Sequence, residues 1–294
     1  MAEHLVRRCG IGPADVVYDL GAGTGILTAA LALHAARVVA LEKDPALADR
    51  LRARFQAHSN VVIRHTDIQT YPLPRADYVV FSSPPFDITA AIIRRLTSAT
   101  VPPRDAWLVL QREAAERYIG SPHQTLAALQ IAPWFSVEVV HHFRKMDFEP
   151  PPSVDAVFVR VHKRGPPLVP ARDAWLYRDL IAAIFPTWRP SVGRSIAATI
   201  GARPAARLLA MAGVDPASRP SAIPLRSWLA LYEQFGRLPE AMRAQVAGSD
   251  LRLRRQQRRL SKRHRTRAPR DGLSAAPSRT LGSGRVEARR VGAV

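Results

Sequence analysis

The sequence predicts an α/β fold in which a seven-stranded, mostly parallel sheet is followed by a small helical domain and a basic tail. Three observations lead to this prediction. Short runs rich in Val and Ile alternate with helix-like segments through the first 163 residues, a rhythm typical of a parallel sheet covered by helices on both faces. A Pro- and Gly-rich join, "KRGPPLVP" at 163–170, ends that rhythm. Short helix-like segments broken by prolines follow at 171–235, and the chain then becomes strongly basic.

The seven strand-like runs share apolar residues, many of them β-branched. They lie at 16–20, 37–41, 61–64, 78–81, 107–110, 137–141 and 156–161. Amphipathic or Ala- and Leu-rich stretches, such as 25–34 and 45–56, separate the first five runs. We therefore expect these five strands to be parallel and joined by helices. The last two runs are joined only by a loop that contains "FRKMDFEPPP", so we expect them to form an antiparallel pair at the sheet edge.

The composition narrows the class of protein. The chain has 294 residues, 47% of them hydrophobic, and one cysteine, Cys9. A single cysteine excludes an internal disulfide and a zinc site built from several cysteines. The sequence has no run of 18 apolar residues, and its N-terminus lacks the apolar core of a signal peptide. The composition thus predicts a soluble, cytoplasmic protein without a membrane or metal partner.

The net charge of +19 is unevenly distributed. From Gly236 onward there are 16 Lys and Arg against 4 Asp and Glu, whereas the first 235 residues hold 27 against 20. The stretch "LRLRRQQRRLSKRHRTRAPR" at 251–270 has few large apolar side chains, so we expect a disordered tail. Such basicity favours a polyanion partner over a merely solvated charge run, because cations release counterions from phosphates. The predicted domains are 1–164, 171–235 and the tail 236–294.

A glycine cluster follows the first predicted strand. In "VVYDLGAGTGILTAAL", Asp19 precedes Gly21-Ala22-Gly23-Thr24-Gly25 between a strand and a helix. Glycines let the backbone approach a ligand, and a helix N-terminus favours electronegative groups. A dinucleotide site has a related spacing, so this pattern alone is weakly specific.

Two further acidic residues sharpen the prediction. Glu42 ends the second strand, where its carboxylate can accept both ribose hydroxyls, and Asp67 follows the third strand, where it can accept from an adenine amino group. This set of acids suits S-adenosyl-L-methionine better than NAD. The residues predicted to bind this cofactor are Asp19, Gly21, Ala22, Gly23, Gly25, Glu42, Lys43, Asp67, Ile68 and Ser83.

The fourth strand ends in an unusual corner, "VVFSSPPFDIT". Ser83-Pro84-Pro85-Phe86 fits the [Asp/Asn/Ser]-Pro-Pro-[Tyr/Phe] pattern of enzymes that methylate exocyclic amines of nucleobases. Such an amine is a poor nucleophile because its lone pair is delocalised into the ring. The Ser83 hydroxyl and the Pro84 carbonyl can accept its two N–H groups and free the lone pair. Phe86 offers a face on which an extruded base can stack.

With "LVLQREAAERY" at 108–118 and Phe148-x-Pro150-x-Pro152-x-Val154-Asp155, these motifs stand in the order and spacing of the ribosomal RNA adenine dimethylase family. The chain resembles this family from residue 12 to residue 235, and it looks most like the Erm macrolide-resistance branch of actinomycetes. The resemblance implies a Rossmann-like class I methyltransferase domain followed by a small helical domain. It implies S-adenosyl-L-methionine-dependent methylation of the N6 of an adenine in 23S ribosomal RNA, with resistance to macrolide-type antibiotics as the result.

The resemblance also implies the catalytic residues. They are Ser83, Pro84, Pro85, Phe86 and Phe148, with Phe148 holding the target base opposite Phe86. The implied partner is 23S ribosomal RNA before the ribosome is fully assembled, and the implied state is a monomer.

Two departures from the family pattern leave alternatives open. Family members usually carry Asn-Ile/Leu-Pro-Tyr/Phe at the corner, where this chain has Ser83 and Pro84. Serine is shorter than asparagine and is common in cytosine-N4 enzymes, so a different ribosomal RNA base or a DNA amino group are alternative targets. The Gln-Asn-Phe segment that precedes the first strand in the family is absent from residues 1–15. Either the true start codon lies upstream or the protein has lost this segment, and its loss would weaken cofactor binding. A catalytically impaired RNA-binding assembly factor is the remaining alternative.

Overall fold

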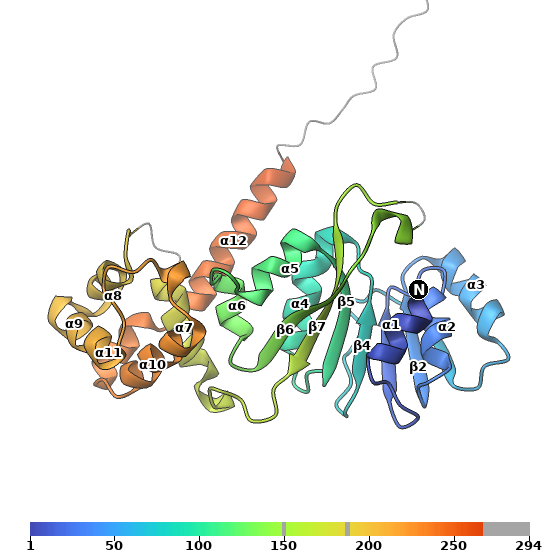
Figure 1. Ribbon diagram of the computed structural model, residues 1–294, viewed down its shortest axis with the longest axis horizontal. Coiled ribbons are helices and arrows are strands. Elements are labelled where there is room, and N and C mark those ends of the chain that lie inside the picture. Colours follow the sequence, from blue (N-terminus) through green and yellow to red (C-terminus); the bar gives the residue numbers. More distant parts are fainter. Residues whose placement is uncertain (149–150, 186–188, 267–294) are drawn as a thin grey trace, which may run out of the picture. The chain divides into compact units, whose positions relative to one another are not determined.

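The structure, a computed structural model, describes residues 1–148, 151–185 and 189–266. Seven strands form one sheet in the order β3-β2-β1-β4-β5-β7-β6. Their bounds are β1 Val16–Leu20, β2 Arg37–Glu42, β3 Val61–His65, β4 Val79–Ser82, β5 Asp105–Gln111, β6 Phe135–His142 and β7 Ala156–Lys163. The first five strands are parallel, and β7 pairs antiparallel with both β5 and β6 (Figure 1). The predicted fold class is confirmed, including the antiparallel pair at the edge.

Helices cover both faces of the sheet (Figure 1). On one face, α1 (Ala2–Arg8) and α2 (Ile26–Ala32) pack on apolar side chains of the central strands, and α3 (Pro45–Phe55) packs on β2. On the other face lie α4 (Thr89–Thr97), α5 (Arg112–Ile119) and α6 (Leu126–Ile131). Successive residues of β4 follow this division, because Val79 and Phe81 join the first core and Val80 joins the second. Helix α1 was not predicted from the sequence, and its Leu5 and Val6 are buried.

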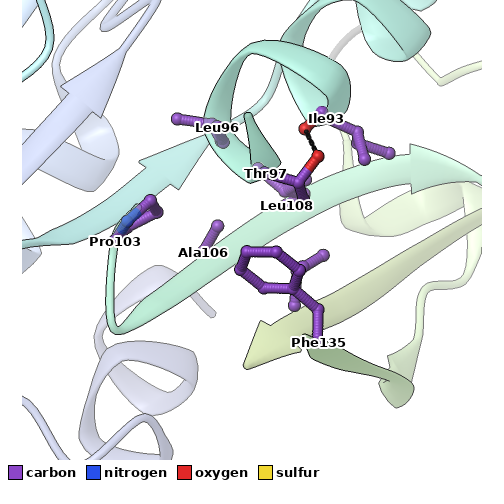
Figure 2. A pocket seen from close by; sticks show the side chains of 8 residues that line it. Ile93, Leu96, Thr97, Pro103, Ala106, Leu108 and Phe135 are labelled. Atoms are coloured by element: carbon purple, nitrogen blue, oxygen red, sulfur yellow. Dashed lines mark hydrogen bonds between the residues drawn. The ribbon is translucent and has the colours of Figure 1, made fainter. Parts of the chain in front are cut away.

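The contact between α4 and the sheet is tightly packed, as Figure 2 shows. Ile93 and Leu96 of α4 face Ala106 and Leu108 of β5, with Phe135 of β6 beside them. The apolar hollow between them has no room for a water molecule. The hydroxyl of Thr97, which borders the hollow, donates to the carbonyl of Ile93 at 2.8 Å (Figure 2). The sheet surface under this part of α4 is therefore closed to ligands.

A helical segment with its own core follows the sheet. It contains α7 (Ala174–Ile184), α8 (Val192–Ile200), α9 (Ala202–Met211) and α10 (Leu225–Gly236). Trp228 and Tyr177 are fully buried in this core. The Tyr177 hydroxyl donates to the carbonyl of Leu129 in α6 at 3.0 Å, and Leu129 belongs to the same core. The helical segment therefore packs directly on the end of the α/β segment, and residues 1–253 form one compact unit.

The prediction of a disordered tail from residue 236 is corrected by the structure for 237–266. This stretch contains α11 (Glu240–Arg243), a 3-10 turn at Ala244–Val246 and α12 (Ser249–Thr266). Val246 is fully buried in the helical core. The carboxylate of Asp179 accepts from the backbone N–H groups of Gly248 and Asp250 at 2.8 and 2.9 Å, so the first turn of α12 is anchored where the composition alone indicated no packing. Residues 267–294 lie outside the described part of the chain. None of the helices that are described is long and apolar enough to span a membrane.

Candidate active site

The candidate site lies where the direction of the strand order changes. β1 has β2 on one side and β4 on the other, and ligands of open α/β sheets bind beyond the carboxyl ends of the strands at such a switch point. Leu20, which precedes the glycine cluster, is the register partner of Ser82, which precedes the Ser-Pro-Pro-Phe motif. The buried Ser82 hydroxyl donates to the Leu20 carbonyl at 2.6 Å. The two motifs thus leave neighbouring strands side by side, and sequence reasoning missed the serine that joins them.

Three residues of the glycine loop adopt the left-handed backbone conformation that favours glycine. Its three glycines with positive φ are Gly21, Gly23 and Gly25, at 80°, 55° and 81°. The N–H groups of Gly21 and Ala22 both donate to the carbonyl of Leu41 in β2, at 2.9 and 3.0 Å. A Cβ on Gly25 would lie 2.6 Å from the Leu51 side chain, whereas a Cβ on Gly21 or Gly23 would meet nothing within 4 Å. Gly25 is therefore required for packing on α3, and the other two glycines border open space.

The carboxylate of Glu42 holds this loop from the end of β2. One oxygen accepts from the N–H of Gly23, and the other accepts from the N–H groups of Lys43 and Asp44, each at 2.8 Å. A carboxylate offers about four acceptor positions, so about one remains for a ligand. The prediction that Glu42 accepts both ribose hydroxyls would require one of these backbone bonds to be released. What the structure adds is a role for Glu42 in shaping the loop.

Asp19 lies underneath the loop, with its side chain fully buried. One carboxylate oxygen accepts from the Thr28 hydroxyl of α2 at 2.6 Å, and the other is buried without a hydrogen-bond partner. Burial raises the pKa of Asp19 to about 6, the charge of Glu42 adds to this rise, and the Thr28 hydrogen bond opposes it. Burial thus destabilises the ionised form of Asp19. Direct contact between Asp19 and a cofactor stays a prediction.

Asp67 and Lys43, both predicted to bind the cofactor, form an ion pair. The Lys43 Nζ lies 2.9 Å from one carboxylate oxygen of Asp67, and the N–H of Gln69 donates to the other at 2.8 Å. The Gln69 hydrogen bond, with Lys43 second, holds the pKa of Asp67 below its usual range. Ile68 beside them is buried in the core under α4. The structure therefore keeps an ionised acceptor at the end of β3, where the sequence placed it.

A pocket of about 310 Å³ brings the two proline-containing motifs together. Its lining residues are Ser83, Pro84, Pro85, Val109, Phe148, Pro152 and Ala156. Phe148 packs edge-on against Phe143, with ring centroids 5.0 Å apart, so its ring is supported from behind. Four of the five predicted catalytic residues line this one pocket. The fifth, Phe86, begins the 3-10 turn after the motif, and its side chain lies outside the described part of the structure, as does Pro150.

Val109 and Ala156 are pocket residues that sequence reasoning missed. They come from β5 and β7, and their apolar side chains look like ordinary core positions in the sequence. The pairing of β4 with β5 places Val109 beside Ser83, and the pairing of β7 with β5 brings Ala156 to the same pocket.

The residues at this edge fit S-adenosyl-L-methionine. Open space borders the backbone of Gly21 and Gly23, an ionised acceptor is kept at Asp67, and a buried carboxylate oxygen of Asp19 is left without a donor. Each of these features suits a ligand with hydroxyl, amino and ammonium donors. Among the described residues there is no group of three or more His, Cys, Asp or Glu that could hold a metal ion.

Comparisons with known proteins place the chain in a family. The family described as "Ribosomal RNA adenine dimethylase" matches residues 1–236. The rRNA adenine N-6-methyltransferase of Bacillus licheniformis is 34% identical over 170 residues, which are 57% of this chain and 59% of that protein. The chain therefore matches less than two thirds of that relative's length. The mycinamicin-resistance protein MyrB of Micromonospora griseorubida is 31% identical over 226 residues, 76% of this chain and 70% of that protein. Among solved structures, the 23S rRNA methyltransferase ErmE has a TM-score of 0.72 and 26% identity, with 79% of this chain and 96% of that chain covered.

Proposed function

The chain belongs to the ribosomal RNA adenine dimethylase family, and we propose that it methylates the exocyclic N6 of an adenine in 23S ribosomal RNA, with S-adenosyl-L-methionine as the methyl donor. The observation that carries the proposal is the position of the 310 Å³ pocket. Ser83, Pro84 and Pro85 line it, and this motif leaves β4 beside the glycine loop that leaves β1. A base in the pocket would thus lie next to a cofactor on the loop.

The cofactor would be held by the backbone at Gly21 and Gly23, by the remaining acceptor position of Glu42 and by the Asp67 carboxylate. When bound, S-adenosyl-L-methionine supplies a methyl group that is electron-poor because it is attached to a sulfonium. The chain needs to provide no acid or metal for this chemistry. Its task is to hold a weak nucleophile in line and close to the methyl carbon, and such positioning can account for a large part of a rate enhancement.

Ser83 and Pro84 would prepare the nucleophile. Their hydroxyl and carbonyl oxygens can accept the two N–H bonds of the adenine amine, which draws the nitrogen toward a tetrahedral shape and makes its lone pair available. The N–C bond would form as the bond between sulfur and the methyl carbon breaks, with its electron pair left on a neutral thioether, and the nitrogen would then lose one proton. Ser83 is exposed whereas Pro84 is buried, so the proton on the Ser83 side has a direct path to solvent.

Phe148 would hold the base against this corner. Stacking on an aromatic side chain contributes roughly 1–3 kcal/mol per base, and the Phe143 ring behind Phe148 limits its movement. A base must leave its stack to enter such a pocket. The basic helix α12, with Arg252 and Arg255 exposed in its first turns, would add sequence-independent contacts to RNA phosphates.

Resistance to macrolide-type antibiotics is the proposed biological result. It is supported by the similarity to MyrB, named as a mycinamicin-resistance protein, and to ErmE. We propose that the protein acts as a cytoplasmic monomer on 23S RNA that is not yet fully assembled into ribosomes. A family relative named as a small-subunit methyltransferase, 28% identical over 244 residues, makes 16S RNA the substrate to test beside it.

The proposal is tested by transfer of a tritiated methyl group from S-adenosyl-L-methionine to protein-free 23S RNA, 16S RNA and DNA. Nuclease digestion and chromatography then identify the labelled nucleoside, and Ser83→Ala serves as the pocket variant. We expect N6-methylated adenosine in 23S RNA, with much less label from Ser83→Ala. Label in 16S RNA would indicate a housekeeping role. Label on another base or in DNA would show that the substrate is a different one. RNA binding without any transfer would favour the assembly factor.

A further inference from the structure

A second pocket, of about 240 Å³, adjoins the proposed base pocket. It is lined by Gln111, Arg112, Glu113, Ser153, Val154 and Asp155. The two pockets are lined by neighbouring residues of the same two segments. Val109 lines the first and Gln111 the second, and residues two apart on a strand point to the same side. On the opposite wall, Pro152 and Ala156 line the first pocket, and the residues between them line the second.

The walls of the second pocket are fixed by the backbone. The N–H of Arg112 donates to the carbonyl of Asp155 at 2.9 Å, and Gln111 is the register partner of Ala156. The Arg112 guanidinium lies 3.8 Å from the Asp155 carboxylate and 3.7 Å from the Glu116 carboxylate. The charges of the pocket are therefore partly balanced within the protein, and the start of α5 is tied to the loop before β7.

The chemistry of the two pockets differs. The first is lined by proline, valine, alanine and phenylalanine apart from Ser83, which suits the flat face of a base. The second has an amide, a hydroxyl, two carboxylates and a guanidinium. The carboxylates of Glu113 and Asp155 disfavour a phosphate there. The mixture of donors and acceptors suits instead the hydrogen-bonding edge of a nucleobase.

We propose that this polar pocket binds the nucleobase next to the target adenine in the RNA strand, and that Gln111 recognises its edge. This inference rests on the proposed function, because the neighbouring pocket must hold the target. The Gln111 amide offers one acceptor and two donor hydrogens, and glutamine pairs with adenine through two hydrogen bonds at its N6 and N7. The pocket thus makes the enzyme selective for the sequence around its target as well as for the target itself.

The experiment uses the full chain and a set of RNA hairpins that differ only in the bases flanking the target adenine. Methyl transfer gives kcat/KM for each hairpin, and fluorescence anisotropy gives its affinity. We expect wild type to prefer one base at one flanking position by roughly ten- to a hundredfold, the discrimination that a pair of base-edge hydrogen bonds provides. Gln111→Ala should abolish that preference by lowering kcat/KM for the favoured hairpin to the level of the other hairpins. Gln56→Ala, at an exposed glutamine that ends α3, is the matched control and should keep the preference.

Gln111→Glu keeps the size of the side chain, so its effect on the preference does not come from a loss of packing. The carboxylate only accepts, so the preference should move toward a base that presents a donor, such as the N4 amine of cytosine. A preference that both Gln111 variants retain, or a wild type that methylates every hairpin equally, overturns the inference and leaves the proposed function intact. A Gln111-dependent preference in binding without methyl transfer would instead contradict the proposed activity and support the pocket.

Discussion

The glycine loop after β1 and the base pocket after β4 are neighbours built in different ways. The loop is held by backbone hydrogen bonds to Leu41 and by the Glu42 carboxylate, so its polar groups are largely satisfied within the protein. The base pocket is shaped by proline rings and by the pair Phe148–Phe143, and its one polar side chain, Ser83, is exposed. The glycine loop is thus held mainly by hydrogen bonds within the protein, whereas the polar group of the base pocket is left available for substrate.

This difference predicts where substitutions act. Changes in the loop should lower stability and cofactor affinity together, because the same bonds hold the backbone and shape the ligand surface. Changes at the exposed Ser83 of the base pocket should lower turnover with little effect on stability, whereas changes at Phe148 should also remove packing on Phe143. Four substitutions test this contrast, in order of decreasing expected effect.

Gly25→Ala should have the largest effect. Its φ of 81° is strained for alanine, and the added Cβ would lie 2.6 Å from Leu51 and 2.9 Å from Phe55. Backbone strain and overpacking together should cost about 2–5 kcal/mol in the free energy of unfolding, measured in urea. Gly21→Ala is the matched control, with a φ of 80° and no atom near its Cβ, and should cost only about 1–2 kcal/mol. Equal losses would show that packing on α3 is unimportant.

Asp19→Asn should change how stability depends on pH. Burial raises the pKa of Asp19 from 3.8 to about 6. Below pH 3.8 the carboxyl is protonated in both states, and as the pH rises toward 6 only the unfolded chain gives up the proton, so wild type loses stability. The variant has no such loss. Its stability relative to wild type should therefore rise between pH 4 and 6 by on the order of 3 kcal/mol and then level off. If the difference in stability between the variant and wild type is constant with pH, burial does not raise the pKa of Asp19.

Phe148→Ala should lower turnover and spare cofactor affinity, with a stability cost from the lost packing on Phe143. Loss of one stacking surface, roughly 1–3 kcal/mol, corresponds to about a 5- to 150-fold fall in kcat/KM for RNA. Phe148→Tyr keeps the ring face and should retain most of the activity. Calorimetry with S-adenosyl-L-methionine provides the contrasting measurement, since a large loss of cofactor affinity in Phe148→Ala would mean that this pocket is not the base pocket.

Lys43→Met should have the smallest effect on stability. The Lys43 side chain is 74% exposed, and its ion pair with Asp67 is open to solvent, so its removal should change the free energy of unfolding by less than about 1 kcal/mol. The N–H of Gln69 is the main cause of the low pKa of Asp67, and that pKa, measured by NMR, should therefore stay below its usual range in the variant. A return to the ordinary value would give Lys43 the larger role.

Much of the fold could be predicted because its signals are local. The first strand run at 16–20 coincides with β1, and the other six overlap β2 to β7, since apolar β-branched runs between helix-like stretches are visible without knowledge of the neighbours. The corner at Ser83 and the motif around Phe148 could also be found, because proline and aromatic residues in such order are rare. Residues of both motifs line one pocket.

The remaining features depend on contacts between distant segments. The helical nature of 237–266 was missed because Val246 is buried by residues far away in the sequence, and because Asp179 anchors the start of α12. The succession of strands and helices, the family motifs and the uneven charge could be predicted, because neighbouring residues carry them. The burial of Asp19, the hydrogen bonds of Glu42 to the loop and the position of Gln111 at a second pocket became visible in the folded chain alone. Burial and hydrogen-bond partners are set by which strands pair, and pairing joins residues that no local pattern connects.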